Sequence, residues 1–401
     1  MNHLIFLLIL PHLKPPSLEY LWPVAEIFFD IGRLVSTIVI ILLYCLKRKL
    51  PSKAVYFLLS LQFLIVLSTC INNGNIWSAV RFALPFISIV IIVDFFASYP
   101  TDLLRSLMAN LELLIYPNLL SILLTYPQGM YIRKNNSGAC YFLGYHNTFF
   151  PYILLAVLIG LLYLKIFQRK MRPICLIAAG YASVFITWSA TSVVVFTLIA
   201  AFLFFSSQKV KRWMTYSGVF FVTMTLNLVI SIFRVMDRIS LISWWIQSVL
   251  KKQVTLTGRI YIWDLCYKLI EKRPLIGYGI EADNIIYSTL GVYSAHNFYL
   301  DLMVKGGISA MVIYLLYSYA MGKKLVGCYD SSVRYIFLVV LAGLYVEFIA
   351  EACQYVLVYV IMVLAYHVDK FEAVPVQARR RVRLVIKRGR HVPNRKFYQK
   401  H

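Results

Sequence analysis

The chain has 401 residues, of which 60% are hydrophobic and 14% are charged, and its mean hydropathy is +0.73. A soluble domain has about a quarter of its residues charged, so this composition excludes an ordinary soluble protein and indicates a polytopic membrane protein. The formal net charge is +23, but most of the excess lies beside the ends of apolar runs, where it points to membrane topology before nucleic-acid binding.

About twelve apolar runs follow one another, several of them close to the roughly 20 residues that a membrane-spanning helix needs. They cover residues 3–13, 24–46, 53–71, 79–97, 103–125, 147–167, 172–188, 190–207, 213–233, 298–321, 333–350 and 351–367. We therefore expect an all-α polytopic integral membrane protein with about 12 transmembrane helices, although eleven or thirteen also fit. Residues 1–369 form the membrane domain of this prediction, and residues 370–401 form a basic tail.

Basic residues gather in four of the segments between these runs and in the tail. The segments contain Lys47, Arg48, Lys49 and Lys53; Arg169, Lys170 and Arg172; Lys209, Lys211 and Arg212; and Lys323 and Lys324. With twelve spans, all five basic regions lie on one side, which the positive-inside rule assigns to the cytoplasm. Both termini are then cytoplasmic, and a large loop over residues 234–297, expected to contain short helices, faces outward. The tail is typical of a topology anchor that touches anionic lipid headgroups, and no motif in it favours nucleic acid.

Two outward segments, 126–147 and 234–297, carry basic residues against this trend. Residues 234–297 hold eight basic and five acidic side chains, a balance of 8 − 5 = +3. Arginines such as Arg133, Arg238 and Arg259 are unfavourable for outward topology, so we infer an anionic ligand on that face. Pairing with local carboxylates or lipid headgroups is the alternative for any single arginine.

Residues 257–273 have the spacing of an amphipathic helix, with Ile262, Cys266 and Leu269 on one face. Thr257 fits as its N-cap and Pro274 as its stop. Arg259 then lies in the first turn, where a guanidinium and free backbone N–H groups can hold one anion together. His296 and Asn297 follow at the start of the next apolar run.

Several kinds of chemistry are not indicated by the sequence. There is no nucleotide-binding glycine motif after a predicted strand, and the seven cysteines show neither CxxC spacing nor pairing with histidine. The outward loops contain no carboxylate pair of the DxD type. We therefore expect neither a cofactor nor a metal, and an enzyme here would handle a phosphorylated substrate with arginine and histidine. A lipid-linked diphosphate, which supplies its own driving force, fits that requirement.

Several motifs together resemble the O-antigen ligase and polysaccharide polymerase superfamily. They are Thr257-Gly258-Arg259, Trp263, Pro274-Leu275-Ile276-Gly277-Tyr278-Gly279, Ala295-His296-Asn297 and Gly306-Gly307. Gly144-Tyr145-His146-Asn147 is similar to that superfamily's G-x-x-N element. Ten residues separate Arg133 from Gly144, a spacing that resembles the R-x10-G element of O-antigen polymerases. The chain departs from the pattern at Ser189-Ala190-Thr191, where many relatives carry Ser-Arg.

The resemblance implies a metal-independent glycosyltransferase in the bacterial cytoplasmic membrane, acting at its outer face on a glycan linked to undecaprenyl diphosphate. His296 is the expected base, because a neutral imidazole can accept the proton of an acceptor hydroxyl. Arg259, with Arg133 or Arg238, is expected to hold the diphosphate. The remaining expected substrate-binding residues are Asn147, Asn297, Gly277 and Gly279.

Three functions fit this resemblance. A polymerase of capsule, O-antigen or exopolysaccharide repeat units is favoured, because the R-x10-G element is present and the Ser-Arg element is missing. Its partners would be membrane lipids, a flippase and a chain-length regulator. The alternatives are a ligase that transfers the finished glycan to an acceptor, and a transporter or flippase of the same lipid-linked glycan. Transport requires charges lining a path through the spans. The few available are Arg33, Arg81, Asp94, Glu112, Glu347 and Glu351, mostly near span ends.

Overall fold

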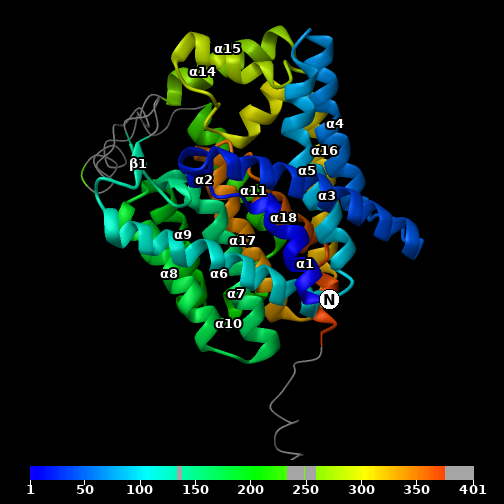
Figure 1. Cartoon of the computed structure of the whole chain (residues 1–401), viewed down its shortest axis with the longest axis vertical. Helices are drawn as coiled ribbons and strands as arrows, with labels where there is room; N and C mark the ends of the chain where they lie inside the picture. The colour runs from blue at the N-terminus through cyan, green and yellow to red at the C-terminus, as the bar shows by residue number, and fades with distance from the viewer. Residues whose placement is uncertain (133–137, 233–247, 249–258, 375–401) are drawn as a thin grey trace, which may run out of the picture.

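The computed structural model describes residues 1–132, 138–232, 248 and 259–374, and this part of the chain is almost entirely helical (Figure 1). The first helices are α1 (Asn2–Ile9), η1 (Leu10–Leu13), α2 (Pro16–Leu21), α3 (Pro23–Lys47), α4 (Lys53–Ile71), α5 (Ile76–Phe96) and α6 (Pro100–Thr125). There follow η2 (His146–Phe149), α7 (Phe150–Phe167), α8 (Met171–Thr187), α9 (Ala190–Phe205), α10 (Gln208–Trp213) and α11 (Tyr216–Ser231). The last are α14 (Arg259–Lys272), α15 (Glu281–Leu290), α16 (Phe298–Val326), α17 (Ser331–Ala350), α18 (Val356–Tyr366) and α19 (Val368–Glu372).

Seven of the described helical segments are long and apolar enough to cross a membrane: α3, α4, α5, α6, η2 with α7, α16 and α17. Five further apolar helices are shorter: residues 2–13, α8, α9, α11 and α18. The prediction of an all-α polytopic membrane protein is confirmed by these helices, whereas the count of twelve spans stays a prediction.

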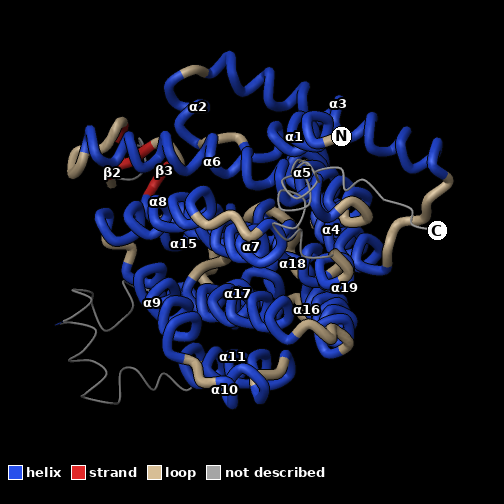
Figure 2. Tube along the Cα trace, turned by 90° about the horizontal axis from the view of Figure 1, so that it is seen from below, coloured by secondary structure: helices blue, strands red, loops and turns tan. Residues whose placement is uncertain are grey.

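The centre of the bundle is formed by α7 and α17, with α16 and α18 beside them (Figure 2). In the most apolar 18 residues of each span, 83% are buried in η2 with α7 and 78% in α17, against 22% in α3. Phe150, Leu154, Phe337 and Leu341 are among the fully buried residues of this core. The two central spans therefore give a rigid frame to whatever side chains lie at their ends.

A small antiparallel sheet, which the sequence did not lead us to expect, precedes α7. Its strands are β1 (Tyr131–Ile132), β2 (Ala139–Tyr141) and β3 (Gly144–Tyr145), in the order β1-β2-β3, with Ile132 opposite Ala139 and Cys140 opposite Tyr145. Two side chains of α6 hold the turn after β2: the backbone N–H groups of Phe142 and Leu143 donate to Ser121 Oγ at 3.1 Å and Asn118 Oδ1 at 2.9 Å. The sheet thereby fixes where η2 begins.

The predicted amphipathic helix is α14, and it lies with α15 at one end of the longest axis of the molecule (Figure 1). Its apolar face is buried as expected, with Ile262, Cys266 and Leu269 packed in one cluster with Ala295 and Leu300. At the opposite end of the axis lies α10, which carries part of the basic sequence (Figure 1). This separation agrees with the predicted topology, and which end faces the cytoplasm stays a prediction.

One break interrupts the helix α16. At Gly307 the backbone has φ 65° and ψ −166°, so the N–H groups of Ile308 and Ser309 turn away and donate to Pro274 O at 2.7 Å and Leu275 O at 3.2 Å. The segment after α14 is thus held in the break in α16 by these backbone hydrogen bonds. Helix α15 also ends at a glycine with positive φ, Gly291, whose φ is 72°.

Candidate active site

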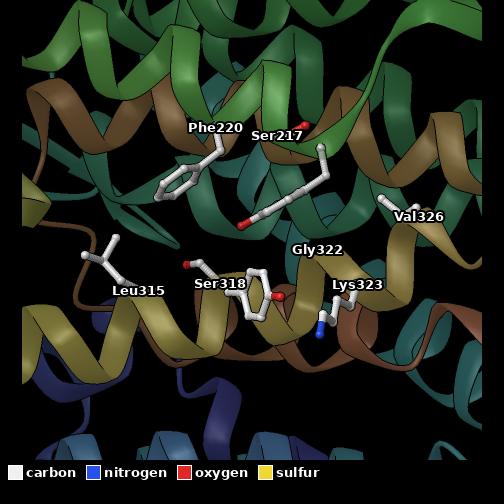
Figure 3. Close-up of a pocket in the computed structure, with 9 residues that line it drawn as sticks. Ser217, Phe220, Leu315, Ser318, Gly322, Lys323 and Val326 are labelled. Atoms are coloured by element: carbon white, nitrogen blue, oxygen red, sulfur yellow. The ribbon is translucent and has the colours of Figure 1, made fainter.

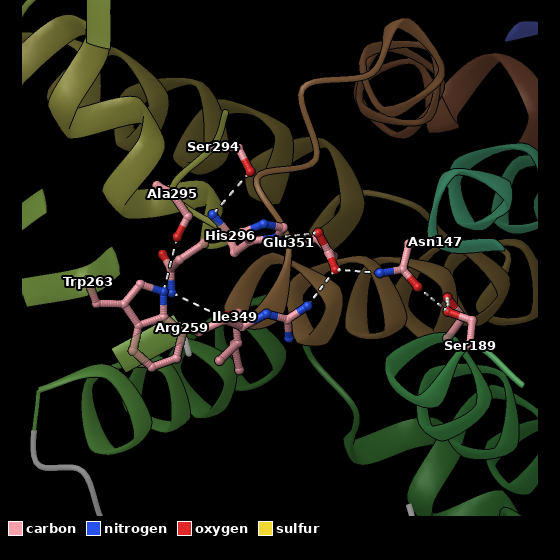
Figure 4. Close-up of polar contacts among 11 residues, drawn as sticks. Asn147, Ser189, Arg259, Trp263, Ser294, Ala295, His296, Ile349 and Glu351 are labelled. Atoms are coloured by element: carbon pink, nitrogen blue, oxygen red, sulfur yellow. Dashed lines mark hydrogen bonds and ion pairs between the residues drawn. The ribbon is translucent and has the colours of Figure 1, made fainter. Parts of the chain in front are cut away.

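The centre of the candidate site is a carboxylate that follows the last residue of α17. Glu351 Oε1 accepts from Arg259 Nη2 at 2.6 Å and from Asn147 Nδ2 at 3.2 Å, while His296 Nδ1 lies 3.1 Å from Glu351 Oε2 (Figure 4). Arg259 is the first residue of α14, His296 precedes α16, and Asn147 lies in η2. The structure therefore brings three of the predicted site residues to one acidic residue.

Opposing effects determine the protonation of Glu351. Burial acts to raise the pKa of this carboxyl, but the charge of Arg259 and the hydrogen bond with His296 outweigh burial, and the pKa is lowered from its usual value. Glu351 is therefore charged at neutral pH. Because a carboxylate only accepts hydrogen bonds, Nδ1 of His296 carries the hydrogen in this contact, which leaves Nε2 as the ring atom that can hold a lone pair.

Asn147 connects the cluster to the position where this chain departs from the superfamily pattern. Ser189 Oγ donates to Asn147 Oδ1 at 3.0 Å (Figure 4), which fixes the amide with its Nδ2 toward Glu351. The residue after Ser189 is alanine, so this position supplies no cation. Instead, Ser189 orients the uncharged amide of Asn147, which donates to Glu351.

The turn that carries His296 is held on both sides. His296 has φ +46°, an uncommon conformation for a residue with a side chain, and such conformations gather at functional sites. Trp263 Nε1 donates to Ala295 O at 3.1 Å on one side (Figure 4). On the other side, Asn297 caps α16 by accepting from the N–H groups of Tyr299 and Leu300, both at 3.1 Å.

Asn297 has further partners in other helices. Its Nδ2 donates to Asn227 Oδ1 at 2.6 Å and to Ile349 O at 3.1 Å, and the residue is fully buried. Since Ile349 is two residues from Glu351, this amide fixes the distance between the histidine turn and the end of α17. Asn297 is therefore placed to position His296.

Among the other predicted substrate-binding residues, Gly277 and Gly279 lie in the segment between α14 and α15. Arg133 and Arg238 fall outside the described residues. Gly277 and Gly279 have φ of +64° and +65°, and a side chain on them would collide with the backbone of α16 and with Thr69 of α4, respectively. The N–H of Gly279 donates to Lys305 O at 2.8 Å, so these glycines dock the segment after α14 onto the spans.

From the sequence, Glu351 and its neighbour Glu347 were considered only as charges for the transport alternative and not as residues of the active site. Glu347 lies one helical turn earlier in α17, is buried, and its Oε2 has no hydrogen-bond partner among the described residues. Two glutamates four residues apart at the junction of two apolar runs are costly in a membrane, and that cost is the signal that could have identified them.

An apolar cavity of about 410 Å³ lies between α11 and α16 (Figure 3). Its walls include Tyr216 and Phe220 from α11, and Leu315 and Tyr319 from α16, with Lys323 at its edge. Leu315, Tyr319 and Lys323 belong to the part of α16 that is distant in sequence from His296. The cavity suits a hydrocarbon chain, and it is separate from the polar cluster around Glu351.

The helical bundle and the Arg–Glu–His cluster define a polytopic membrane protein with a candidate site at the end of its central spans. Residues 174–315 match the family model described as O-antigen ligase. The match supports the O-antigen ligase and polymerase superfamily, whose members are glycosyltransferase-like enzymes, and it confirms the resemblance seen in the sequence. It includes Arg259 and His296, whereas Asn147 and Glu351 lie outside it. No curated protein matches the chain.

Proposed function

We propose that this protein polymerises oligosaccharide repeat units carried on undecaprenyl diphosphate, at the outer face of the bacterial cytoplasmic membrane. The observation that carries the proposal is the carboxylate of Glu351, shared between the guanidinium of Arg259 and the imidazole of His296. The cluster of these three side chains combines a cation that can stabilise a phosphorylated leaving group with a base that can accept the proton of a sugar hydroxyl. Glycosyl transfer from a lipid diphosphate uses both groups.

The base in this mechanism is His296. Its Nε2 accepts the proton of the acceptor hydroxyl while the hydroxyl oxygen attacks the anomeric carbon of the donor sugar. The bond from that carbon to the diphosphate breaks, and its electron pair stays on the phosphate oxygen. Glu351 stabilises the imidazolium that forms and keeps Nδ1 protonated, so the lone pair faces the acceptor.

Arg259 stabilises the departing diphosphate. Only its Nη2 contacts Glu351, so the remaining N–H groups of the guanidinium can bind phosphate oxygens as their charge grows. We propose that no metal takes part, since the arginine supplies the positive charge. The polymerase reaction is favoured over ligation by the spacing of Arg133 and Gly144 and by the alanine that follows Ser189.

The test uses purified full-length protein in lipid nanodiscs with a lipid-linked repeat unit, followed by separation of products by chain length. The wild type should make long chains with or without excess EDTA, and Glu351→Gln should leave single repeats. The matched control is Glu112→Gln, because Glu112 also forms an Arg–Glu pair, with Arg172 at 2.6 Å, but in another part of the molecule.

Three outcomes would contradict the proposal. Loss of activity with EDTA that returns on adding a divalent cation would exclude the metal-free mechanism. Equal activity of Glu351→Gln and wild type would exclude the shared carboxylate. Transfer of a finished glycan to an added acceptor, without growth of the chain, would identify a ligase instead of a polymerase.

A further inference from the structure

A polar pocket, separate from the apolar cavity between α11 and α16, lies at the far end of α7 from the candidate active site. It has a volume of about 490 Å³ and is lined by residues of α1, α6, the end of α7 and the start of α8. The 18 residues of α7 separate it from Asn147 by about 27 Å, at 1.5 Å per residue. The pocket therefore lies toward the membrane surface opposite to the one that holds Glu351.

Three arginines line this pocket, and one of them has a carboxylate partner in the part of the chain that the structure describes. Arg172 donates from Nε and Nη2 to the two carboxylate oxygens of Glu112, both at 2.6 Å. Within the described residues, neither Arg105 nor Arg169 forms an ion pair. Arg105 is half-buried, with its guanidinium 4.9 Å from the centre of the Phe167 ring. A half-buried guanidinium without an anion is costly, so the pocket favours an anionic ligand.

The backbone of α8 adds to this preference. The helix begins beside the pocket with Lys170 as its N-cap, without a side-chain cap and without an acidic residue in its first turn. Its first N–H groups and the positive end of its dipole therefore attract an anion. Asn2 supplies a hydrogen-bond acceptor. Its Oδ1 is buried in the pocket wall and receives no hydrogen bond from the described residues. The pocket thus offers cations together with one acceptor for a hydroxyl.

The surroundings of the pocket are those of a lipid-facing surface. Leu4 and Leu7 of α1 are exposed at 42% and 61%, next to the pocket residues His3 and Phe6. A ligand with a hydrocarbon portion can therefore cover apolar side chains while its head lies among the arginines.

We propose that this pocket binds the phosphate headgroup of an anionic phospholipid that also carries a hydroxyl, such as a phosphatidylglycerol. Arg105 and Arg169 bind the phosphate, Asn2 Oδ1 accepts the headgroup hydroxyl, and the acyl chains lie along α1. The inference is independent of the proposed glycosyl transfer, since it rests on residues at the other end of the bundle.

The test measures lipid retention by the full-length protein in nanodiscs of phosphatidylcholine with or without phosphatidylglycerol. Native mass spectrometry should detect retained phosphatidylglycerol on the wild type, and retention should fall about tenfold in Arg105→Ala and in Arg169→Ala, because each loses a charge-assisted hydrogen bond. Lys209→Ala, on the exposed helix α10, is the control and should retain the lipid. Since Arg169 is exposed, its variant tests the site even where Arg105→Ala does not fold.

Equal retention by the wild type and both arginine variants would overturn the proposal, and so would an equal loss in Lys209→Ala. A parallel measurement adds inorganic phosphate to protein in pure phosphatidylcholine. Thermal stabilisation by phosphate that matches the effect of phosphatidylglycerol, and that needs Arg105, would assign the site to a free phosphate and overturn the lipid source.

Discussion

Two largely buried ionic clusters join the segment of α14 and α15 to the spans. They differ in whether their cationic side chains keep hydrogen-bonding groups that no neighbouring residue uses. In the first, Arg259 and His296 share Glu351, and their side chains are 15%, 29% and 13% exposed, in that order. In the second, Lys305 Nζ lies 3.0 Å from both Asp283 and Asp301, and the lysine and Asp301 are only 3% and 1% exposed.

The second cluster is closed around its cation, although Asp283 Oδ1 is buried without a hydrogen-bond partner among the described residues. Asp301 Oδ2 also accepts from Gln354 Nε2 at 2.9 Å, and Lys305 Nζ lies 5.7 Å from the ring centre of Phe82. In the first cluster, by contrast, the guanidinium of Arg259 and Nε2 of His296 keep hydrogen-bonding capacity that no described residue uses. A cation enclosed by two carboxylates holds helices together, whereas an open cluster, whose cation and imidazole keep free N–H groups and a lone pair, can bind and react. Gln354 and Glu351 are in the same loop between α17 and α18, so the two clusters are neighbours along the chain.

The largest expected effect is on the open cluster. His296→Ala removes the proposed base and should lower the rate of glycosyl transfer by about 10²–10⁴-fold, the usual contribution of general-base catalysis. Single lipid-linked repeats should accumulate, while the amount of folded protein is unchanged in size-exclusion chromatography. Turnover equal to that of the wild type would show that the open cluster, like the closed one, does not provide a catalytic base.

The matching change in the closed cluster is Lys305→Met. It leaves Asp283 and Asp301 without their cation and should lower the free energy of unfolding by about 3–5 kcal/mol, as removal of one partner from a buried ion pair does. Thermal unfolding in nanodiscs measures this loss, and adding Asp283→Asn and Asp301→Asn should restore part of it. Activity per folded molecule should change little. A stable but inactive Lys305→Met would show that the second cluster takes part in the reaction.

Arg259→Lys sharpens the comparison, because it keeps the charge beside Glu351 but loses the planar fork. A lysine ammonium is a point charge and cannot donate two parallel hydrogen bonds to one phosphate as the planar guanidinium does, so the rate should fall about 10- to 100-fold. Arg259→Ala should abolish polymer while the protein stays in the membrane. The measurement is chain length against time, and polymer of wild-type length from the lysine variant would contradict a bidentate role.

The smallest expected effect concerns pH. The lowered pKa of Glu351 means that its charged form stabilises the fold, so this contribution is present at neutral pH and is lost as the pH falls through the lowered value. The difference in thermal stability between wild type and Glu351→Gln should therefore persist down to about pH 4.3, the ordinary range of glutamate, and shrink only below it. A difference that disappears already between pH 7 and 5 would contradict the charged state.

Local patterns were sufficient to predict the apolar helices and α14, but not the short helices α2, α10, α15 and α19. The apolar runs correspond to helices that begin and end within a few residues of the expected positions, and the spacing of Ile262, Cys266 and Leu269 correctly predicted α14. These are properties of neighbouring residues, so periodicity and length contain them. The small sheet was not predicted, because strands of two or three residues have too few alternations to give a pattern.

The candidate site was predicted only in part. Arg259 and His296 could be selected from their motifs, but Glu351 is 92 residues from Arg259 and 204 from Asn147. Spacing along the chain does not indicate a contact of that range. The final apolar run also concealed the loop at 351–355, because no proline or glycine marks where α17 ends and α18 begins.

The turn at Gly291 is a suitable site for inserting an epitope into the protein in living cells. Around the position that a side chain would take there, no heavy atom lies within 4 Å, and the turn closes α15 at the end of the molecule that holds α14. Exposed turns of this kind accept inserted peptides without disturbing the core. A short epitope after Gly291 should leave the protein folded, and antibodies added to spheroplasts should label it without permeabilisation if the turn faces outward. The same epitope would then allow the protein to be captured from its native membrane together with whatever lipids it holds.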